Sequence, residues 1–337
     1  MTSRALLPDL PDKNLVGIAR LAASGEHLRD GHNVEYLTLP ARSVLNRCTA
    51  KYMPFTWTIN LYRGCEFACK YCYARFTHEF MELRDGLDFE RKIYVKQQTA
   101  WLLRRDLKRV KPGEAIAIGT ATDPYQPAER KFEVTRGILE ELGQHAALSI
   151  GMVTKSQLVT RDIDLLQRIS EHNDLTINIT VTTMDPDLAR ILEPRAPRPD
   201  LRMAAVTRLV QAGIHAGVIC APVLPGITDT TRNLDTLVRT AARAQAQFIY
   251  TNPLFLKPCS EKIFLPFLQE HFPHLVNEYR KRFKESGYVS AAYRRRLGEL
   301  MQKLCHKHGM PDREARRAQR ARNAGRVEYR AEQMALF

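Results

Sequence analysis

Three cysteines in one short stretch of the chain have the spacing that most directly predicts chemistry. Cys65, Cys69 and Cys72 stand at CxxxCxxC spacing directly after an apolar, β-branched segment. A structural zinc site usually takes four tetrahedral ligands from two such pairs, and no second pair follows at a suitable distance. Thiolates this close suit iron–sulfur chemistry, and a [4Fe–4S] cluster held by three cysteines keeps one iron open for another ligand. The alternatives are an ordinary loop with three cysteines, or a zinc site completed by a distant histidine.

The stretch Asn60–Tyr73 resembles the signature of the radical S-adenosylmethionine (SAM) superfamily, in which an aromatic residue precedes the third cysteine, as Tyr71 does here. In that family the open iron is chelated by the amino and carboxylate groups of SAM. One electron from the reduced cluster then cleaves the sulfonium S–C5′ bond, and the resulting 5′-deoxyadenosyl radical abstracts hydrogen. The resemblance implies that this chain is an enzyme with a [4Fe–4S] cluster, SAM and a one-electron reductant such as flavodoxin or ferredoxin as its partners. The protein would position these cofactors and exclude water.

An alternation of strand and helix patterns surrounds this stretch. Strands are predicted by runs rich in β-branched and apolar residues, at Phe55–Tyr62, Ala115–Gly119, Leu148–Thr154, Leu175–Thr182, His215–Val223 and Phe248–Phe255. Helical periodicity predicts the intervening helices, at Thr99–Val110, Val134–Gly143, Ile163–His172, Pro186–Leu192, Arg202–Ala212 and Arg232–Ala244. Alternation of this kind indicates a parallel α/β sheet, either open or closed. The resemblance implies a partial (β/α)6 TIM-like barrel, the radical SAM core.

The predicted organisation has four parts. Residues 1–50 read as an irregular lead-in with one short strand or turn near Tyr36–Asn46, and residues 51–260 form the radical SAM core. Within that core, Arg75–Gln98 has a mixed pattern that predicts irregular structure. Residues 261–311 predict a C-terminal helical extension of two or three helices, and residues 312–337 a basic C-terminal tail.

Polar residues end several of the predicted strands, which is where barrels of this type carry their chemistry. The segment after the second strand, where radical SAM proteins bind the amino group of SAM, offers Thr122 and Asp123, with Glu129 a weaker candidate. Lys155 ends the third strand, and with the preceding segment it resembles the spore photoproduct lyase-like branch of the superfamily, which implies pairing with the SAM carboxylate. The alternatives are that Asp123 caps a proline-rich turn and that Lys155 is a surface lysine.

Further candidates follow from the same resemblance. Thr180 and Thr182 end the fourth strand, where this branch has a hydroxyl residue that contacts SAM, and the turn in Pro222–Asp229 would lie beside the adenosine. Tyr71 and Tyr73 would pack on the adenine or on the cluster. Threonine also favours strands by β-propensity alone, so these residues need no functional role to explain them.

The chain departs from the spore photoproduct lyase pattern at one point. Those enzymes have a cysteine just after the second strand that donates hydrogen to the product radical, whereas this chain reads Gly119–Thr122 there without a cysteine. Direct reversal of thymine dimers by the same route therefore does not follow from the resemblance. Cys220 or Cys259 could substitute from neighbouring strand ends, and the alternative is that both are buried structural thiols.

The chain is basic, with 51 lysine and arginine residues against 37 aspartate and glutamate residues. Residues 280–337 hold 16 basic and 6 acidic side chains, a net charge of +10. Such an excess predicts a polyanionic partner such as nucleic acid, and the alternative is a solvated helical tail. Three functions follow: a radical SAM enzyme acting on nucleic acid in DNA repair or modification, lyase-like; the same chemistry on a small molecule or peptide; or a non-enzymatic basic nucleic-acid-binding protein with a structural metal site.

The extreme C-terminus ends on apolar residues after a stretch rich in arginine. Gln333, Leu336 and Phe337 resemble the QxxLF peptide by which bacterial replication and repair proteins dock on the DNA sliding clamp. In that peptide the glutamine forms hydrogen bonds and the apolar residues fill a pocket. The alternative is that Leu336 and Phe337 fold back onto the barrel.

The chain shows no sign of membrane insertion or secretion. Its first residues lack an apolar signal region, and no apolar run approaches the roughly 20 residues that a membrane helix needs. Seven cysteines, an odd number, also argue against a secreted disulfide framework. We therefore expect a cytoplasmic protein.

Overall fold

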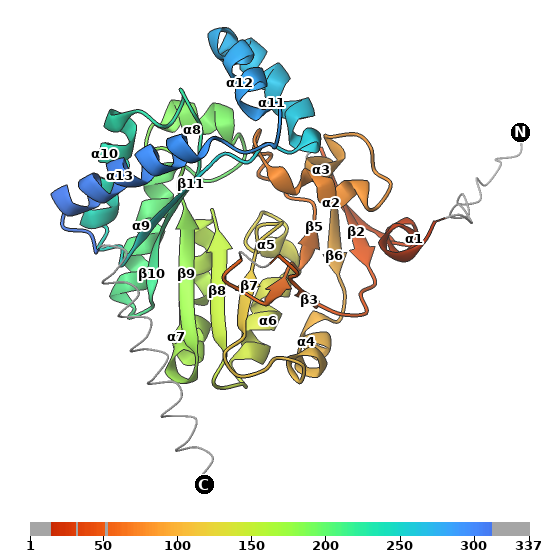
Figure 1. The fold of residues 1–337 in the computed structure, drawn as a ribbon. Coiled ribbons are helices and arrows are strands. Elements are labelled where there is room, and N and C mark those ends of the chain that lie inside the picture. Colours follow the sequence, from red (N-terminus) through yellow and green to blue (C-terminus); the bar gives the residue numbers. More distant parts are fainter. Residues whose placement is uncertain (1–14, 32, 51–52, 312–337) are drawn as a thin grey trace, which may run out of the picture.

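The computed structural model describes residues 15–31, 33–50 and 53–311 (Figure 1). The predicted basic tail, with Gln333, Leu336 and Phe337, lies outside this part of the chain. Of the helices in the described ranges, none combines the length and the apolar character that a membrane crossing requires.

A seven-stranded sheet forms the centre of the molecule. Its order is β11-β10-β9-β8-β7-β4-β3, and every pair is parallel except β3 with β4. The strands are β3 (Leu45–Arg47), β4 (Trp57–Ile59), β7 (Ala115–Ile118), β8 (Ser149–Thr154), β9 (Asp174–Thr180), β10 (Ala216–Val223) and β11 (Ile249–Pro253). Six parallel strands in sequence order confirm the predicted partial (β/α)6 barrel, and their carboxyl ends meet at one rim.

Helices cover the outer side of this sheet, as Figure 1 shows. They are α4 (Thr99–Leu107), α6 (Val134–Leu142), α7 (Ile163–His172), α8 (Pro186–Leu192), α9 (Pro199–Gln211) and α10 (Thr231–Arg243). Each buries an apolar stripe: on α10, Leu234, Leu237, Val238 and Ala241 recur at helical spacing and are all buried. The start of α8 is fixed by Asp185, whose side chain caps the first turn, and by a proline at the first helical position.

A second, four-stranded sheet corrects two predictions. Its order is β1-β2-β6-β5, with β1 (His27–Gly31), β2 (Val34–Leu39), β5 (Tyr62–Arg63) and β6 (Lys92–Lys96). The predictions of an irregular lead-in with one short strand and of irregular structure over Arg75–Gln98 were therefore wrong. The predicted strand Phe55–Tyr62 is also divided, because its last residue leaves the main sheet and pairs with Val95 of β6.

The segments around this second sheet are short. They comprise α1 (Gly17–Ala23), the 3-10 turn η1 (Tyr73–Arg75), α2 (Phe76–Glu79), α3 (Asp88–Arg91) and α5 (Glu129–Phe132). Ala22 of α1 packs with Leu39, Met81 and Tyr94 in a small apolar cluster of its own. Strand β5 of this sheet leads directly into the cysteine loop, here defined as residues 64–73.

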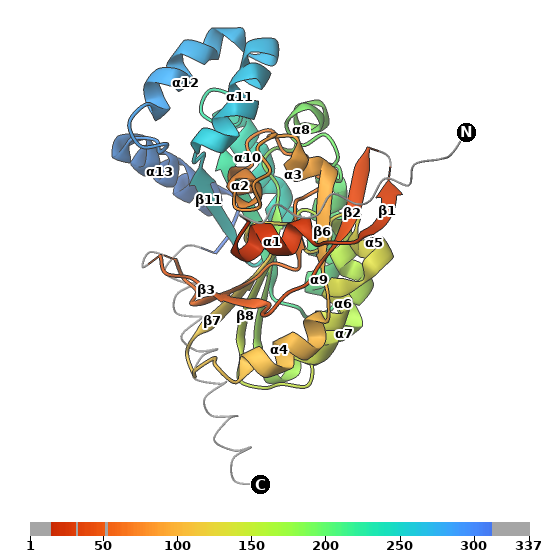
Figure 2. The same ribbon diagram turned by 90° about the vertical axis from the view of Figure 1, so that its right-hand side faces the viewer.

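Three further helices complete the described chain, which confirms the predicted helical extension. They are α11 (Pro258–His271), α12 (Val276–Phe283) and α13 (Ala291–Lys307), and the 3-10 turn η3 (Pro273–Leu275) joins the first two. Another 3-10 turn, η2 (Gln157–Asp162), precedes α7. Figure 2 shows α11 and α12 standing above the rim of the barrel, while α13 runs back along α10. Contacts with Asp235 of α10 fix the end of α13 in this position: Oδ1 of Asp235 lies 2.8 Å from Nζ of Lys307 and 2.9 Å from Nε2 of His308.

Candidate functional site at the cysteine loop

The cysteine loop begins with a turn that only glycine fits. Gly64 has φ +84°, and a Cβ there would lie 2.6 Å from the carbonyl oxygen of Lys92 and 2.9 Å from that of Phe89. The next residue, Cys65, donates its backbone N–H to Phe89 at 2.8 Å. The first cysteine is therefore fixed against α3 and β6 by a turn that any side chain would push open.

The three thiols lie in a largely apolar environment. Cys69 is buried, and Cys65 and Cys72 are half-buried and pack against the same apolar cluster, which contains Phe67, Tyr71, Leu192, Leu254 and Phe264. Burial raises the pKa of all three thiols, that of Cys69 to about 12. None forms a disulfide. Three soft sulfur donors on one short loop match the ligand type of an iron–sulfur cluster. Within the described ranges, no three Cys, His, Asp or Glu side chains are grouped as ligands of a single metal ion.

Hydrogen bonds attach the segment after β7 to the residues that lead into the cysteine loop, Asn60 and Tyr62. Asn60 donates its amide to the Thr120 hydroxyl at 3.2 Å and accepts the backbone N–H of Ala121 at 2.8 Å. The Thr122 hydroxyl donates to the carbonyl oxygen of Tyr62 at 3.2 Å. The segment predicted to bind the amino group of SAM is thereby held directly beside the cysteines.

Asp123 connects two strand ends of the barrel. One carboxylate oxygen accepts the Thr154 hydroxyl at 2.6 Å and the backbone N–H of Tyr125 at 2.9 Å, and the other accepts the backbone N–H of Lys155 at 2.7 Å. Burial raises the pKa of Asp123, although these hydrogen bonds act in the opposite direction. The sequence placed Asp123 and Lys155 at the same rim, and the structure brings them into contact.

A buried carboxylate that the sequence did not single out lies at the centre of the site. Glu193, only 1% exposed, follows α8. Its Oε1 accepts hydrogen bonds from the hydroxyls of Tyr71 and Thr182, the latter at 3.1 Å. Tyr71 and Thr182, both predicted to contact SAM, therefore both donate to Glu193. The sequence around Glu193 is a proline-rich loop, which gave no signal of this role.

Arg202 is the buried cation opposite this carboxylate. Its Nη2 lies 2.5 Å from Oε2 of Glu193, and its Nη1 donates to the carbonyl oxygen of Thr180 at 3.2 Å. Burial by itself raises the pKa of Glu193, but Arg202 and Lys155 together hold that pKa below its ordinary value. Glu193 is therefore ionised in a setting with little solvent.

Lys155 points into the same group from the end of β8. Its side chain is 16% exposed, and its Nζ lies 3.9 Å from Oε1 of Glu193 and 5.8 Å from the centroid of the Tyr71 ring. Burial alone would lower the pKa of Lys155, but Cys69 and Glu193 raise it above the ordinary value. The surface-lysine alternative does not describe this position. In the part of the chain that the structure describes, the ammonium makes no hydrogen bond, which leaves it able to receive an anionic ligand.

The end of the cysteine loop, at Tyr73, contacts the start of α11, at Cys259. The Tyr73 hydroxyl donates to the carbonyl oxygen of Thr120, and the ring is 41% exposed. The Cys259 thiol lies 3.9 Å from the carbonyl oxygen of Tyr73, and the Ser260 hydroxyl donates to that of Cys72 at 2.8 Å. The start of α11 therefore contacts the loop, whereas Cys220 is fully buried within β10.

Two weaker candidates have other contacts. The buried Glu129 accepts hydrogen bonds from the backbone N–H groups of Thr135 and Arg136 and so caps α6. In the turn after β10, Asp229 accepts the backbone N–H of Gly226 at 2.8 Å and the Tyr293 hydroxyl at 2.8 Å. Glu129 thus stabilises a helix, and the turn expected beside the adenosine is tied to α13.

Sequence comparison with known proteins relates this chain to a family and to several other proteins. The model of the radical SAM superfamily matches residues 59–237. An uncharacterized protein of Mycobacterium tuberculosis is 33% identical over 301 residues, which cover 89% of this chain and 87% of that protein. An uncharacterized protein of Methanocaldococcus jannaschii is 29% identical over 240 residues, 71% of this chain and 85% of that protein.

Solved structures of spore photoproduct lyase have a similar fold. The enzyme complexed with the dinucleoside spore photoproduct aligns with a TM-score of 0.62 at 15% identity, covering 90% of this chain and 85% of that chain. A double mutant with bound SAM and the same dinucleoside aligns with a TM-score of 0.59 at 16% identity, over 81% of this chain and 79% of that one. At such identities the similarity concerns the fold.

Proposed function

We propose that this chain, which belongs to the radical SAM superfamily, holds its [4Fe–4S] cluster through Cys65, Cys69 and Cys72 and its SAM at the adjoining rim of the barrel. The family carries out its chemistry by reductive cleavage of SAM at such a cluster. The observation that carries the proposal is the position of Lys155: its side chain is only 16% exposed, and its ammonium lies next to Cys69 and Glu193 without a hydrogen bond to another described residue.

Each side chain at the rim has a task in this proposal. Lys155 pairs with the carboxylate of SAM, because an ammonium without a short partner gains most from an incoming anion. Thr122, Thr180 and Thr182 line the adjoining strand ends, and Asp123 holds the β7 and β8 ends together at Thr154. Tyr71 and the apolar cluster around it exclude water from the thiols. Tyr73, more exposed, borders the same space.

The proposal is tested by anaerobic reconstitution with iron and sulfide, followed by SAM and a chemical reductant. We expect a brown protein with cluster absorbance that forms 5′-deoxyadenosine only when the reductant is present. Full loading with zinc and no SAM cleavage would instead support the non-enzymatic alternative, a nucleic-acid-binding protein with a structural metal.

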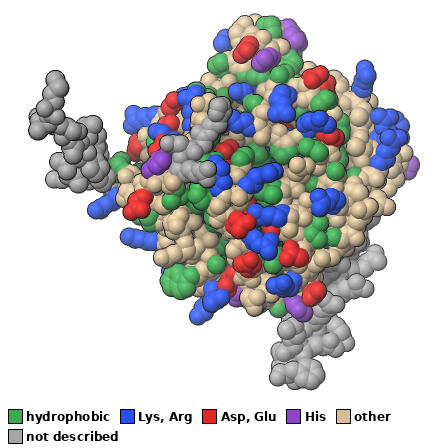
Figure 3. All heavy atoms as spheres, turned by 180° about the vertical axis from the view of Figure 1, so that it is seen from behind, with side chains coloured by type: hydrophobic (Ala, Val, Ile, Leu, Met, Phe, Trp, Pro, Cys, Tyr) green, Lys and Arg blue, Asp and Glu red, His purple; other side chains and the backbone are tan. Residues whose placement is uncertain are grey.

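Nucleic acid is the proposed substrate, in a lyase-like DNA repair or modification reaction. The support is the net positive charge of the C-terminal residues and the fold shared with an enzyme solved in complex with a dinucleoside. On the face in Figure 3, by contrast, basic side chains are scattered among acidic ones. A nucleic-acid path would therefore depend on the rim and the C-terminal segment rather than on that face.

The substrate is tested by adding single- and double-stranded oligonucleotides, with and without ultraviolet damage, to the SAM cleavage reaction. Stimulated 5′-deoxyadenosine formation together with an altered oligonucleotide mass is the expected result. Stimulation by a peptide or small metabolite alone would favour the alternative substrate class.

Two finer proposals concern organisation and a partner. The division into a lead-in of residues 1–50, a core of 51–260, an extension of 261–311 and a tail of 312–337 remains a proposal about domains. Docking of Gln333, Leu336 and Phe337 on a DNA sliding clamp is likewise a proposal that rests on the sequence alone. A fluorescent peptide of residues 326–337, titrated with clamp beside a double Leu336→Ala, Phe337→Ala control, tests it. Equal binding by both peptides would refute it.

A further inference from the structure

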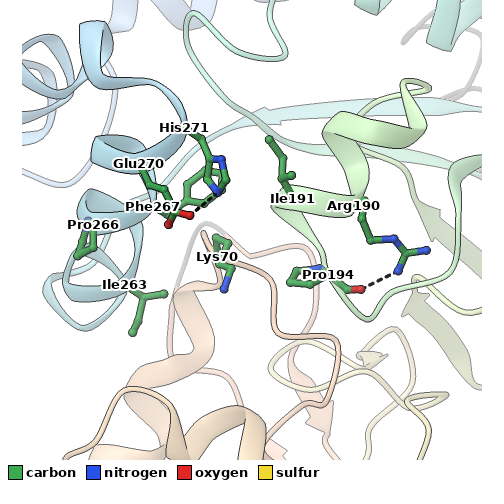
Figure 4. A pocket seen from close by; sticks show the side chains of 9 residues that line it. All are labelled: Lys70, Arg190, Ile191, Pro194, Ile263, Pro266, Phe267, Glu270 and His271. Carbon is green, nitrogen blue, oxygen red and sulfur yellow. Dashed lines mark hydrogen bonds and ion pairs between the residues drawn. The ribbon is translucent and has the colours of Figure 1, made fainter.

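A cavity of about 400 Å³ lies on the outer side of the cysteine loop, between that loop, α8 and α11 (Figure 4). Lys70, the residue after Cys69, forms part of its wall. Its other lining residues are Arg190, Ile191, Pro194, Ile263, Pro266, Phe267, Glu270 and His271. The cavity therefore reaches to within one residue of a proposed cluster ligand.

The segment 190–195 separates this cavity from the SAM-binding rim and has two different faces. Its inner face carries the buried Glu193, which contacts Tyr71 and Arg202. Its outer face carries the exposed side chains of Arg190 and Arg195. Two backbone hydrogen bonds fasten the segment to the cysteine loop, from Lys70 to Leu192 at 3.0 Å and from Arg195 to Phe67 at 3.4 Å. A molecule in the cavity would thus contact Arg190, Ile191 and Pro194 of this segment, whereas Glu193 of the same segment contacts Tyr71 and Arg202.

The chemistry of the cavity is that of a protein interface with a basic rim. Ile263, Pro266 and Phe267 of α11 supply an apolar wall, and Lys70 and Arg190 stand across from it. Among the described lining residues the acid is Glu270, which lies 3.7 Å from the exposed His271. Apolar surface with a few peripheral charges is typical of protein contacts, and the charges mainly steer the partner and fix its register.

We propose that this cavity is the docking site of an acidic one-electron carrier protein of the flavodoxin or ferredoxin class. This inference rests on the proposed function, because a radical SAM enzyme needs one electron for each reductive cleavage. The reduced carrier loses one electron to the enzyme, and no atom or proton needs to cross the interface. Electron transfer weakens steeply with distance, so a carrier must come close to the cysteine loop. This cavity offers that approach without blocking the rim.

The test measures binding of purified oxidised flavodoxin to the reconstituted holoprotein by calorimetry, at low and moderate salt. Arg190→Glu should weaken the affinity by about tenfold and reduce its salt dependence, because a like charge then faces the acidic carrier. His271→Glu, on the opposite wall, should weaken it as well, and this second variant guards against a local folding defect in the first. Arg168→Glu, on α7 and outside the cavity lining, is the matched control and should bind as the parent protein does.

A second readout separates this inference from the proposed function. With dithionite as the reductant, His271→Glu should cleave SAM at the parent rate, and with reduced flavodoxin it should be slower. Arg190→Glu is judged by the ratio of its rates with flavodoxin and with dithionite, because Arg190 also donates to the carbonyl oxygen of Pro194 beside Glu193. Equal flavodoxin affinity in the parent, both cavity variants and the Arg168→Glu control would overturn the docking site. Loss of affinity for an oligonucleotide instead of flavodoxin would assign the cavity to nucleic acid and also overturn it. A parent protein that cleaves no SAM with dithionite would refute the proposed function and leave the binding comparison valid.

Discussion

The molecule contains two buried carboxylate networks, and they differ in how completely their hydrogen-bonding groups are used. The first, here the α6 network, joins Glu129 and Asp162 to Arg161, with Tyr62 and Tyr125 as further donors. The second, here the rim network, joins Glu193 to Arg202, Lys155, Tyr71 and Thr182. In both networks the carboxylates are buried, and both networks contain cations and tyrosines.

In the α6 network every carboxylate oxygen has two donors. For Glu129 these are the Tyr62 hydroxyl at 2.6 Å, two backbone N–H groups at 2.8 and 3.1 Å, and Arg161 at 2.9 Å. Asp162 is satisfied to the same degree by Arg136, Arg161 and Tyr125. A network this complete stabilises one conformation and has no capacity for a ligand.

The rim network is incomplete. Oε2 of Glu193 faces Arg202 as an ion pair, but it makes no well-aligned hydrogen bond in the described chain. Lys155 lies 3.9 Å from Oε1, beyond hydrogen-bonding distance. Charges largely removed from water are costly when their bonding capacity is unused, and the SAM carboxylate that we propose to bind here would supply the missing partner of Lys155.

The largest expected effect concerns the cysteines that adjoin the rim network. Cys65→Ala, Cys69→Ala or Cys72→Ala should each abolish cluster binding, because a cluster held by three thiolates cannot lose one and remain firmly bound. Iron and sulfide content after anaerobic reconstitution is the measurement. Cys48→Ala and Cys305→Ala are the controls and should keep the parent iron content. A ligand variant with full iron and sulfide would refute the assignment.

Next in size is the stability effect of breaking the α6 network. Glu129→Gln removes the charge opposite Arg161 in a fully buried position, which should lower the free energy of unfolding by about 3 to 5 kcal/mol. Urea unfolding followed by circular dichroism measures the loss. SAM affinity of the folded variant should equal that of the parent protein. A large change in SAM affinity with little loss of stability would reverse the distinction between the two networks.

Lys155→Ala, in contrast to Glu129→Gln, should lower the affinity for SAM. The variant loses a charge-assisted hydrogen bond to the SAM carboxylate, typically about 1.5 to 3 kcal/mol, so SAM affinity should fall roughly tenfold or more. Calorimetric titration of SAM into the holoprotein gives the value, and the iron content should not change. An unaltered affinity would mean that the Lys155 ammonium pairs only with Glu193 and does not bind SAM.

The sequence predicted those parts of the fold that depend on neighbouring residues. Helices α7 and α8 have the predicted ends, because apolar spacing and the Asp185 cap are local signals. The second sheet was missed, because β2 pairs in parallel with β6, more than 50 residues later, and no local pattern encodes that partner. Arg75–Gln98 consequently looked irregular although it contains β6.

In the candidate site, the residues at strand ends could be predicted from the sequence, and the residues outside the strand ends could not. Placing polar residues at strand ends correctly grouped Asp123, Thr154 and Lys155, because parallel strands share one rim. Glu193 and Arg202 could not be found in this way. They come from a loop and a helix outside the strand ends, and their importance arises from burial against Tyr71, which only the folded chain shows.

The smallest effects test whether a single hydroxyl belongs to function or to stability. Thr182→Val keeps the side-chain shape and removes one donor from the incomplete rim network, at 3.1 Å from Glu193. A net hydrogen bond contributes about 0.5 to 1.5 kcal/mol, so SAM affinity should fall by about two- to tenfold.

Thr135→Val is the matched control, because the Thr135 hydroxyl donates to the carbonyl oxygen of Pro124 beside the complete α6 network. Its loss should reduce the free energy of unfolding by about 1 kcal/mol and leave SAM affinity unchanged. For each of the two variants, calorimetric titration with SAM gives the SAM affinity, and urea unfolding gives the free energy of unfolding. If Thr182→Val lowers only stability, the rim network is as purely structural as the α6 network, and unused hydrogen-bonding capacity does not distinguish the two regions.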